Sequence, residues 1–498
     1  MSSQFRLLRE RRFLPFFLTQ FLGAFNDNVY KNALVVLITF QAAHLGADSP
    51  GVLVNLAAGV FILPFFLFSA TAGQLADKYE KSRLIRATKL LEIAVMALAA
   101  VGFARMSLPL LLVVLFLMGM QSALFGPVKY AIIPQQLADD ELVGGNALVE
   151  AATFVAILAG TIVGGLLVMG EAGPGRVAVA VLGIALLGWW SSRAIPPAAA
   201  ADPGLRVNWN PVTQTREMLR FMLEARTVFA AIVGISWFWF YGALFLSQFP
   251  GFAADHLGGD ERAVTLLLAP FSIGIGAGSL LCGRLSRGRV EPRMVLPGAI
   301  GLSLFALDLW WASPAAGAFA PGQELAALFS RAEVWRVVFD LVMIGACGGF
   351  FIVPLYALVQ QRSAPAHRAR VIAGNNILNA LFMVGAAAMG AGLLAAGLAV
   401  PQLFLVTAVL NAVAAAALFV CEPTFRRRSA APTSHPGPRR LPWERRQART
   451  GRRAAAAASI GDGCIRGCRR SYMPPRAAAA AVGAAAGASR DRWLALLR

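Results

Sequence analysis

Residues 73–85 read GQLADKYEKSRLI, a short charged segment that follows one long apolar stretch and precedes another. A related segment, GRLSRGRVEPRMV, occupies residues 283–295, which is 210 residues further along the chain. A second pair of segments repeats with a similar spacing, because GNALVEA at 145–151 resembles GNNILNA at 374–380, 229 residues later. Two matches at nearly the same spacing indicate that the chain contains a duplicated unit.

The apolar stretches around these segments define the fold class. Of the 498 residues, 57% are hydrophobic and only 14% are charged, and the mean hydropathy is +0.63. Several stretches of about 20 residues carry few or no charges, which is the length of helix that crosses a ~30 Å hydrocarbon core. We therefore predict an all-α membrane protein, because a soluble core does not need so many apolar segments.

The number and direction of the membrane spans follow from the apolar stretches and the charges between them. If the N-terminus is cytoplasmic, the segments predicted inside hold 21 Lys and Arg before residue 426, and those predicted outside hold five. This bias is the one expected of cytoplasmic loops, and a missed span would scramble it. We predict two cytoplasmic termini and twelve transmembrane helices, at about 13–42, 50–72, 84–104, 106–130, 145–170, 175–195, 227–250, 262–283, 293–312, 334–360, 370–395 and 400–422.

The longest polar connection, residues 191–226, divides the chain into two halves. It opens with PPAAAADPG and ends with NPVTQTREMLRFML, whose polar and apolar faces predict a helix at the membrane surface. We predict two pseudo-symmetric six-helix bundles, at 1–195 and 227–425, joined by a cytoplasmic linker at 196–226. A duplication of this kind places a substrate path between the bundles, near the bilayer midplane.

The net charge of +19 is concentrated in the last 73 residues of the chain. The segment 426–498 holds 17 Arg and three acidic residues, which leaves 28 Lys and Arg against 23 Asp and Glu elsewhere. The charge therefore does not indicate a nucleic-acid groove on a folded domain. One interpretation of this segment is a disordered Arg- and Ala-rich tail on an anionic leaflet. The favoured interpretation is out-of-frame translation of a GC-rich gene, in which case a downstream soluble domain has been lost.

The cysteines and the N-terminus carry no sign of a metal site, a cofactor or a cleaved leader. Cys282, Cys347 and Cys421 lie in apolar segments, whereas Cys464 and Cys468 have a C-x3-C spacing with no His nearby. We expect neither a disulfide nor a metal ion. MSSQFRLLRERR has no small-residue cleavage site and predicts a retained first helix.

The segment GAFNDNVYKN, residues 23–32, places charges in the middle of the first predicted span. Intramembrane charges are costly and usually face a cavity or a partner. Asp27 and Lys31 are four residues apart, so they share one helical face, and Asn28 lies beside them. We predict that all three line the polar part of the path, with Asp27 and Lys31 partly neutralising each other. A purely structural ion pair is the alternative.

Four further residues are candidates for the path. Lys129 is a lone cation near the end of the fourth span, where snorkelling would also explain it, and Glu150 is a lone acid in the fifth. Asn375 lies in the repeated GNN segment, and Tyr241 lies in an aromatic stretch of the seventh span. The alternative for such aromatic residues is a position facing lipid. Candidates for apolar walls are Phe61, Phe65, Phe66, Phe68, Trp237, Trp239, Phe240, Tyr241 and Phe245.

Other features of the spans concern packing and charge. Gly160, Gly164 and Gly165 give the fifth span a face of small residues, which predicts close packing against a neighbouring helix. The remaining ionisable residues within spans lie near predicted ends, where a half-solvated position and a functional one are both open. These residues are Glu92, Asp308 and Asp340.

The charged segment at 73–85 predicts a gating loop. Gly73 would allow two helices to pack closely, and Asp77 would face a helix N-terminus or an Arg of the other half. Lys81 and Arg83 would hold the loop to the anionic leaflet. The second copy supplies Gly283 and, in place of the Asp, Arg287. The alternative is a cytoplasmic loop that is merely positive.

The pattern G-x-L-x-D…K-x-R resembles the loop signature of the major facilitator superfamily, with Glu80 where that family usually has Gly. Four other stretches, F-x-x-TQFLGAFNDN-x-x-KNAL, FGPVKY-x-I-x-P, GGN-x-L-x-EA-x-x-x-AI-x-x-G and GGFFIVPL, together resemble its lysophospholipid transporter family. The resemblance covers about residues 10–422. It is nearest to the version found fused to an acyltransferase and an acyl-acyl-carrier-protein synthetase.

This resemblance implies a secondary transporter, not an enzyme, in a bacterial inner membrane. It implies a monomer that moves lysophospholipids, chiefly lysophosphatidylethanolamine, for reacylation by a fused or partner acyltransferase. It also assigns Asp27 and Lys129 to the polar lining of the path, and Asp77 to a charge relay that locks the outward-open state.

Three other functions compete with this reading. A proton-coupled exporter of drugs or small metabolites would use Asp27 or Glu150, and a nontransporting scaffold for an acyltransferase would use neither. A membrane-embedded acyltransferase would need an H-x4-D pair. His44 and His256 instead have their acids, Asp48 and Asp260, one residue too close.

Overall fold

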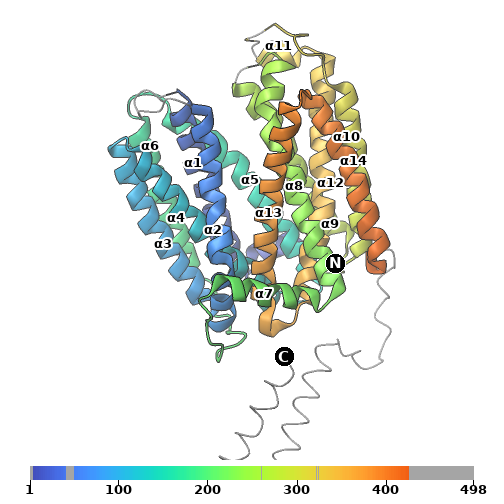
Figure 1. The fold of residues 1–498 in the computed structure, drawn as a ribbon. Coiled ribbons are helices and arrows are strands. Elements are labelled where there is room, and N and C mark those ends of the chain that lie inside the picture. Colours follow the sequence, from blue (N-terminus) through green and yellow to red (C-terminus); the bar gives the residue numbers. More distant parts are fainter. Residues whose placement is uncertain (1–3, 41–49, 260, 321, 323–324, 426–498) are drawn as a thin grey trace, which may run out of the picture. The chain divides into compact units, whose positions relative to one another are not determined.

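The computed structural model describes residues 4–40, 50–259, 261–320, 322 and 325–425, which belong to one compact unit, Met1–Ser429 (Figure 1). The predicted tail, 426–498, lies outside the described residues, as do His44, Asp48 and Asp260.

The described chain is helical almost throughout. The N-terminal helices are η1 (Gln4–Arg9), α1 (Leu14–Phe40), α2 (Pro50–Lys78), α3 (Lys81–Ala104), α4 (Leu108–Gln136), α5 (Leu142–Val168) and α6 (Gly173–Ser192). The connection between the halves holds α7 (Pro211–Leu223). The C-terminal helices are α8 (Arg226–Asp255), α9 (Glu261–Leu285), η3 (Pro292–Met294), α10 (Val295–Ala312), α11 (Leu325–Phe329), α12 (Ala332–Arg362), η4 (Pro365–His367), α13 (Arg368–Ala395), α14 (Val400–Cys421) and η5 (Pro423–Phe425).

Eleven helices within the described ranges are long and apolar enough to cross a membrane. The one predicted span that is not among these eleven is the first, 13–42. It corresponds to α1, which has 27 residues but a polar centre that includes Asp27 and Lys31. Helices satisfy their own backbone hydrogen bonds, which is why apolar sequences of this length form them in lipid. The predicted all-α membrane fold is confirmed.

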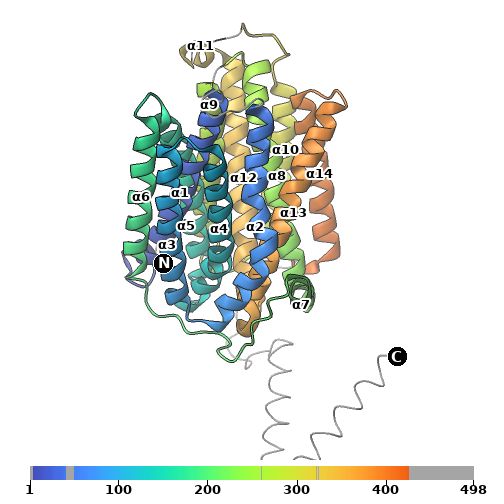
Figure 2. The ribbon, with the colours of Figure 1, turned by 60° about the vertical axis from the view of Figure 1, so that its left-hand side comes forward.

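The long helices form two bundles that stand beside each other (Figures 1 and 2). The N-terminal bundle consists of α1–α6, and the C-terminal bundle of α8, α9, α10, α12, α13 and α14. Helix α7 runs across one end, roughly at right angles to the spans, whereas α11 lies at the opposite end. We call the first of these the α7 end.

The fifth predicted span packs closely against the first, as its small residues predict. A Cβ atom on Gly160 would lie 2.6 Å from the carbonyl oxygen of Phe25, and one on Gly164 would lie 2.4 Å from that of Val29. Real side-chain carbons do not approach backbone oxygens so closely. The two glycines therefore allow α5 to contact the backbone of α1.

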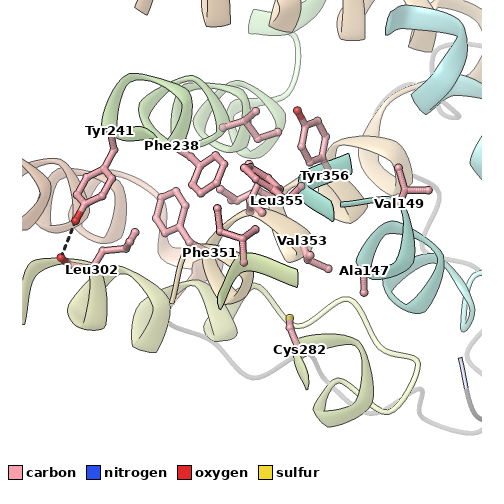
Figure 3. Close-up of a cluster of buried hydrophobic side chains, with 14 of the residues drawn as sticks. Ala147, Val149, Phe238, Tyr241, Cys282, Leu302, Phe351, Val353, Leu355 and Tyr356 are labelled. Atoms are coloured by element: carbon pink, nitrogen blue, oxygen red, sulfur yellow. Dashed lines mark hydrogen bonds between the residues drawn. The ribbon is translucent and has the colours of Figure 1, made fainter. Parts of the chain in front are cut away.

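The buried core joins the two bundles at the α7 end. Ala147 and Val149 of α5 belong to the same buried cluster as Val353 and Leu355 of α12, which Figure 3 shows in close-up. A second cluster, which includes Tyr30, is built from α1–α6 and contains no residue of the C-terminal bundle. The bundles thus share apolar surface near α7, whereas the remainder of the N-terminal bundle has its own core.

Within the described ranges, three sets of hydrogen bonds join the bundles, and each lies at the α7 end. Gln4 donates to the carbonyl oxygen of Leu280 at 3.0 Å. The amides of Asn146 on α5 and Gln360 on α12 exchange two hydrogen bonds, of 2.7 and 3.0 Å, in a buried position. The third set surrounds Asp77 and is described below. Together these bonds hold the bundles closed at this end.

The connection between the bundles is tied to the α2–α3 turn. The backbone nitrogens of Ala201 and Asp202 donate to the carbonyl oxygen of Asp77, both at 2.9 Å. Gln74 exchanges two hydrogen bonds with the backbone of Asn208. Helix α7 begins at Pro211, one residue after an Asn210 side chain that caps its first turn. It buries one face, with Gln214, Met218 and Met222, and exposes the other.

Candidate substrate path and gate

Asp27 lies in the middle of α1 with half of its carboxylate unpaired. Its Oδ2 atom accepts a hydrogen bond of 2.8 Å from Ser122 on α4, whereas Oδ1 is buried and has no partner among the described residues. The residue is partly exposed although it belongs to a span. A carboxylate in this state retains hydrogen-bonding capacity for a ligand or for water.

Lys31 does not pair directly with Asp27. No contact within 4.0 Å joins their charged atoms in the part of the chain that the structure describes, although the sequence predicts mutual neutralisation. Instead, Lys31 Nζ lies 4.5 Å from the ring centroid of Phe61 on α2, a cation–π contact. Ser122 on α4 and Phe61 on α2 therefore contact the two charges separately.

Of the two neighbouring asparagines, Asn28 forms a hydrogen bond within α1 and Asn32 forms one with α5. Asn28 donates to the carbonyl oxygen of Ala24 at 2.7 Å, one turn earlier in the same helix. Asn32 donates to the carbonyl oxygen of Thr161 on α5, also at 2.7 Å. Asn28 is partly exposed, and its position on the path stays a prediction.

A buried ion pair lies behind these residues, in a position that the sequence did not predict. Lys89 and Glu92 of α3 are 0% and 2% exposed, and Lys89 Nζ lies 2.6 Å from Glu92 Oε2. Asn26 and Gln121 also donate to the Glu92 carboxylate, at 3.0 and 3.2 Å. Of the two positions left open for Glu92, the half-solvated one is therefore excluded. The three-residue spacing of Lys89 and Glu92 was the signal that could have identified the pair.

Asp308 and Asp340 differ from each other. Asp308 is partly exposed and pairs with Arg336, whereas Asp340 is fully buried and neither of its carboxylate oxygens has a hydrogen-bond partner among the described residues. A half-solvated position is therefore right for Asp308 and wrong for Asp340.

Lys129 and Glu150 occupy a second polar region between α4 and α5. Lys129 Nζ donates to Thr153 Oγ1 at 3.1 Å, and Tyr130 donates to Glu150 at 2.8 Å. Glu150 is fully buried, and its second oxygen has no partner within the described ranges. Lys129 is partly exposed and contacts α5, so its side chain points toward a polar group inside the bundle.

Aromatic side chains connect this region to the C-terminal bundle. The rings of Tyr130 and Tyr356 stack with centroids 4.3 Å apart, and Trp239 Nε1 donates to the Tyr356 hydroxyl at 3.4 Å. Phe154 stacks on Trp239 and meets Phe238 edge to face. The sequence contained these aromatic residues, but their pairing depends on how the two bundles dock.

The two remaining path candidates lie on the C-terminal bundle. Asn375 on α13 is buried, and neither atom of its amide has a partner among the described residues. Tyr241 on α8 is packed inside the bundle, where its hydroxyl donates to the carbonyl oxygen of Leu302 at 3.0 Å (Figure 3). Its ring stacks on Phe245. Tyr241 therefore supports the C-terminal core in this conformation, and its position on the path stays a prediction.

The aromatic residues of α2 and α8 differ in their surroundings. Phe61 and Phe65 are partly exposed and meet edge to face at 5.9 Å. Trp237 donates to Asn411 of α14 at 2.9 Å, and Phe245 is buried. The α2 residues fit the predicted apolar wall beside Lys31, whereas Trp237 and Phe245 hold the C-terminal bundle together.

Asp77 contacts both kinds of partner that the sequence predicts for it. Its two carboxylate oxygens accept hydrogen bonds from the backbone nitrogens of Ala369 and Arg370, at the N-terminus of α13. Oδ2 also accepts from Arg370 Nε at 3.0 Å, and the pair is buried. A carboxylate at a helix N-terminus and beside a guanidinium is stabilised by both. The contact fastens α2 to α13.

Gly73, one turn before Asp77, makes this contact possible. A Cβ atom there would lie 2.7 Å from Ala373 Cβ and 2.9 Å from Arg370 Cα. Gly283 has a similar function in the second copy, because a Cβ atom would collide with the side chains of Gln4 and Ala147. Both glycines lie where the bundles meet.

The charged residues of the gating loop do not all face outward. Lys81 is buried, and its Nζ donates to the carbonyl oxygen of Ala199 in the linker at 3.3 Å, so the expected contact with a lipid leaflet is wrong in this conformation. Arg83 is 84% exposed and is free to meet a leaflet. Arg287 is exposed in the turn after α9, with a positive φ of 51°.

Glu80 replaces the usual glycine with a helix cap. Its carboxylate accepts hydrogen bonds from the backbone nitrogens of Ser82 and Arg83 and, from the linker, of Ala198. Burial alone would raise the pKa of Glu80, but these hydrogen bonds outweigh it and lower the pKa below its ordinary value. Glu80 therefore starts α3 and holds the linker.

Arg12 fixes the start of α1 in a comparable way. It makes two hydrogen bonds of 2.7 and 2.6 Å to the carboxylate of Glu141 at the start of α5, and it also pairs with Glu10. The bond to Arg12 lowers the pKa of Glu141, and the bond to Glu141 raises the pKa of Arg12.

Among the described residues, no three His, Cys, Asp or Glu side chains lie together in a way that could hold a metal ion.

Two helical bundles that meet at one end, with charged groups on their inner helices, are typical of secondary transporters. The family model of the Major Facilitator Superfamily matches residues 16–323. Two solved structures share the fold. The human organic anion transporter MFSD10 has a TM-score of 0.61 and 15% identity, and the match covers 82% of this chain and 99% of that chain. The Escherichia coli fucose:proton symporter FucP has a TM-score of 0.59 and 14% identity, and the match covers 83% of this chain and 100% of that chain. At these identities they bear on the fold alone.

More similar sequences come from bacterial transporters. The lysophospholipid transporter LplT of Pectobacterium carotovorum is 30% identical over 369 residues, which cover 72% of this chain and 80% of the relative. LplT of Escherichia coli O1:K1 is 30% identical over 373 residues, 72% of this chain and 81% of the relative. The chain belongs to the lysophospholipid transporter family of the major facilitator superfamily. The predicted family is confirmed, and with it the class of secondary transporter rather than enzyme.

Proposed function

We propose that this chain moves lysophospholipids, of the lysophosphatidylethanolamine type, across a bacterial inner membrane for reacylation. The observation that carries the proposal is the separate environment of Asp27 and Lys31, within a chain 30% identical to lysophospholipid transporters. A phosphoethanolamine head group carries one ammonium and one phosphate. An acid with a free oxygen and a cation that is not bonded to it complement these two charges.

Apolar groups beside this charge pair fit the rest of such a substrate. Phe61 and Phe65 are partly exposed next to Lys31 and offer a wall for a single acyl chain. Lys129, with Glu150 and Asn375 further toward the α7 end, extends the polar lining. All three retain polar atoms that are partly exposed or without a hydrogen-bond partner in the described chain.

The proposed transport cycle alternates access between the two ends of the bundles. The Asp77–Arg370 contact, the Asn146–Gln360 pair and the close approach at Gly73 keep the α7 end closed. We propose that this end is cytoplasmic, as the charge bias of the sequence predicts. Breaking these contacts while the bundles rock about the substrate would open the path to the cytoplasm.

The proposed organisation has a bundle at 1–195, a cytoplasmic linker with a surface helix at 196–226, and a second bundle at 227–425. We propose that the protein acts as a monomer and delivers its substrate to an acyltransferase and acyl-acyl-carrier-protein synthetase partner. Each bundle contributes one wall of the path, so a second copy is not needed to complete it.

A substrate comparison tests the proposal. Proteoliposomes that contain the chain are given fluorescent lysophosphatidylethanolamine or, under an imposed proton gradient, a cationic dye. We expect faster movement of the lipid than in empty vesicles, and no dye uptake above that background. Dye movement coupled to protons without lipid movement would support the exporter alternative. Movement of neither would support the scaffold.

A further inference from the structure

A cavity of about 1230 Å³ at the α7 end is lined by both bundles and lies apart from the proposed path. One wall comes from η1 and the residues before α1, a second from the α4–α5 turn, and a third from the end of α9 and the turn after it. Its charged lining consists of Arg6, Arg9, Glu10, Arg12, Asp140, Glu141, Arg284 and Arg287. Five guanidinium groups thus face one space with three carboxylates.

The carboxylates neutralise only part of this positive charge. Glu141 and Glu10 are held by Arg12, and Arg6 lies 3.4 Å from Glu10. Arg9, Arg284 and Arg287 line the cavity, are exposed, and form no ion pair within 4.0 Å with another described residue. Asp140 is the one remaining acid of the lining. The cavity therefore has an excess of cationic groups that the protein itself does not satisfy.

The need for positive charge on the cytoplasmic side does not explain this arrangement. The positive-inside rule accounts for the number of arginines at the cytoplasmic end of a membrane protein, but it does not place them around a common space. Arg216 on α7 and Arg289 after α9 are exposed at the same end and do not line the cavity. The cavity is also larger than the ~300–1,000 Å³ of typical ligand sites, which leaves room for a lipid head group.

We propose that this cavity binds a phosphate-bearing anion, the head group of an anionic phospholipid or a soluble phosphate, and thereby stabilises the closed α7 end. Guanidinium groups bind phosphate oxygens in pairs of parallel hydrogen bonds. Arg9 belongs to the N-terminal bundle, and Arg284 and Arg287 belong to the C-terminal bundle. An anion between them bridges the two bundles, and it loses one set of partners when the bundles separate.

Binding to one conformation alone shifts the equilibrium toward it. At an anion concentration ten times the Kd, the ratio of closed to open molecules at this end would rise about tenfold. The cavity would then act as a site where the composition of the membrane, or the phosphate of the cytoplasm, adjusts the transport cycle.

Calorimetry on the full chain in an uncharged detergent tests the binding. The probes are short-chain phosphatidylglycerol, inorganic phosphate, and short-chain phosphatidylcholine as a lipid without net charge. We expect saturable binding of phosphatidylglycerol or phosphate, and none of phosphatidylcholine. Binding of phosphatidylglycerol alone identifies a lipid as the ligand, whereas binding of phosphate as well identifies a soluble anion. Absence of saturable binding of either anion overturns the proposal.

Two variants with the same loss of charge locate the site. Arg9→Gln/Arg284→Gln removes one guanidinium from each bundle inside the cavity, and Arg216→Gln/Arg289→Gln removes two outside it. We expect the first variant to bind the anion at least about tenfold more weakly, because that factor corresponds to the loss of one charge-assisted hydrogen bond. We expect near-native affinity in the second. An equal loss in both variants would mean nonspecific attraction and would overturn the proposal.

A conformational measurement tests the proposed consequence. Spin labels at Tyr79→Cys and Gln361→Cys, with the five native cysteines replaced by serine, report the separation of the bundles at the α7 end. We expect the bound anion to increase the closed population in the wild-type cavity and not in Arg9→Gln/Arg284→Gln. Binding without this shift would refute the bridging role.

Discussion

At the scale of single residues, the charges inside the N-terminal bundle fall into two kinds. Lys89 and Glu92 are fully buried and satisfied by each other, by Asn26 and by Gln121. Asp27 is partly exposed and has an oxygen without a partner in the described chain. The first arrangement is complete without a ligand and is therefore structural. The second leaves capacity for one.

The structural assignment of Lys89 and Glu92 predicts a large loss of stability in Glu92→Gln. The substitution keeps the shape of the side chain but leaves the Lys89 ammonium buried without a counter-charge, which costs about 3–5 kcal/mol. Thermal or denaturant unfolding in detergent would measure the loss.

Two comparisons accompany this measurement. Asp308→Asn breaks the exposed pair with Arg336 and should cost about 1 kcal/mol or less. Lys89→Met/Glu92→Leu removes both buried charges and should recover most of the stability. Equal losses in Glu92→Gln and Asp308→Asn would show that the buried pair has no special weight.

Glu80 predicts a pH-dependent contribution to stability. Its carboxylate caps α3 and holds Ala198, and its pKa in the folded state is lowered from the ordinary value of 4.5. A carboxyl with a lowered folded-state pKa stabilises the fold fully above its unfolded value, and this contribution is lost as the pH falls through the folded value. Glu80→Gln should therefore lower the melting temperature at pH 7, by the equivalent of about 1 kcal/mol for a weakened cap.

The expected difference from the wild type begins to shrink as the pH falls below about 4.5, and it is lost once the pH is below the lowered folded-state pKa, where Glu80 is uncharged like glutamine. Melting temperatures of the two proteins between pH 7 and pH 4 provide the comparison. A difference that stays constant, or grows, over this range would contradict the role of the Glu80 charge.

At the scale of helices, α2 holds two glycines with opposite surroundings. Gly73 faces Ala373 and Arg370 across the bundle interface, whereas a Cβ atom on Gly59 would have nothing within 4 Å. Gly73→Ala should force α2 and α13 apart, at a cost of about 1–3 kcal/mol to the closed α7 end. This corresponds to a loss of about 5- to 150-fold in the ratio of closed to open molecules.

Gly59→Ala is the matched control, because it adds the same methyl group to the same helix in open space. Distance distributions between labels at Tyr79→Cys and Gln361→Cys would measure both variants. We expect a wider separation at the α7 end in Gly73→Ala and none in Gly59→Ala. An unchanged distribution in Gly73→Ala would contradict the proposed close contact of the gate.

The helices themselves were largely predictable from the sequence, because lipid allows only segments that satisfy their own backbone hydrogen bonds. The sequence also predicted that Asp77 would face either a helix N-terminus or an Arg of the other half, and the structure shows both contacts. The partners of Asp27 and Lys31 were not. Ser122 and Phe61 lie on two other helices, and their approach depends on how α1, α2 and α4 rotate and cross. Sequence spacing along α1 left a direct ion pair open as an alternative, and no contact within 4.0 Å joins the two charges among the described residues.

At the scale of the whole unit, the two bundles share buried apolar surface near α7. Among the described residues, the hydrogen bonds between the bundles lie at this same end. The duplicated charged segments of the sequence lie at this same end. Their differences are informative, since Asp77 binds the partner bundle whereas its counterpart Arg287 faces the anion-sized cavity. We therefore propose that the duplication supplies a gate on one side and a regulatory site on the other.

The central claim is that the charge of Asp27 serves the passage of a lysophospholipid between the bundles. The most direct test is the initial rate at which proteoliposomes move fluorescent lysophosphatidylethanolamine between leaflets, compared among wild type, Asp27→Asn and empty vesicles. We predict a wild-type rate well above that of empty vesicles, and a loss of about tenfold or more in Asp27→Asn with an unchanged melting temperature, the effect of one lost charged contact. A wild-type rate equal to that of empty vesicles, or full activity in Asp27→Asn, would contradict the account.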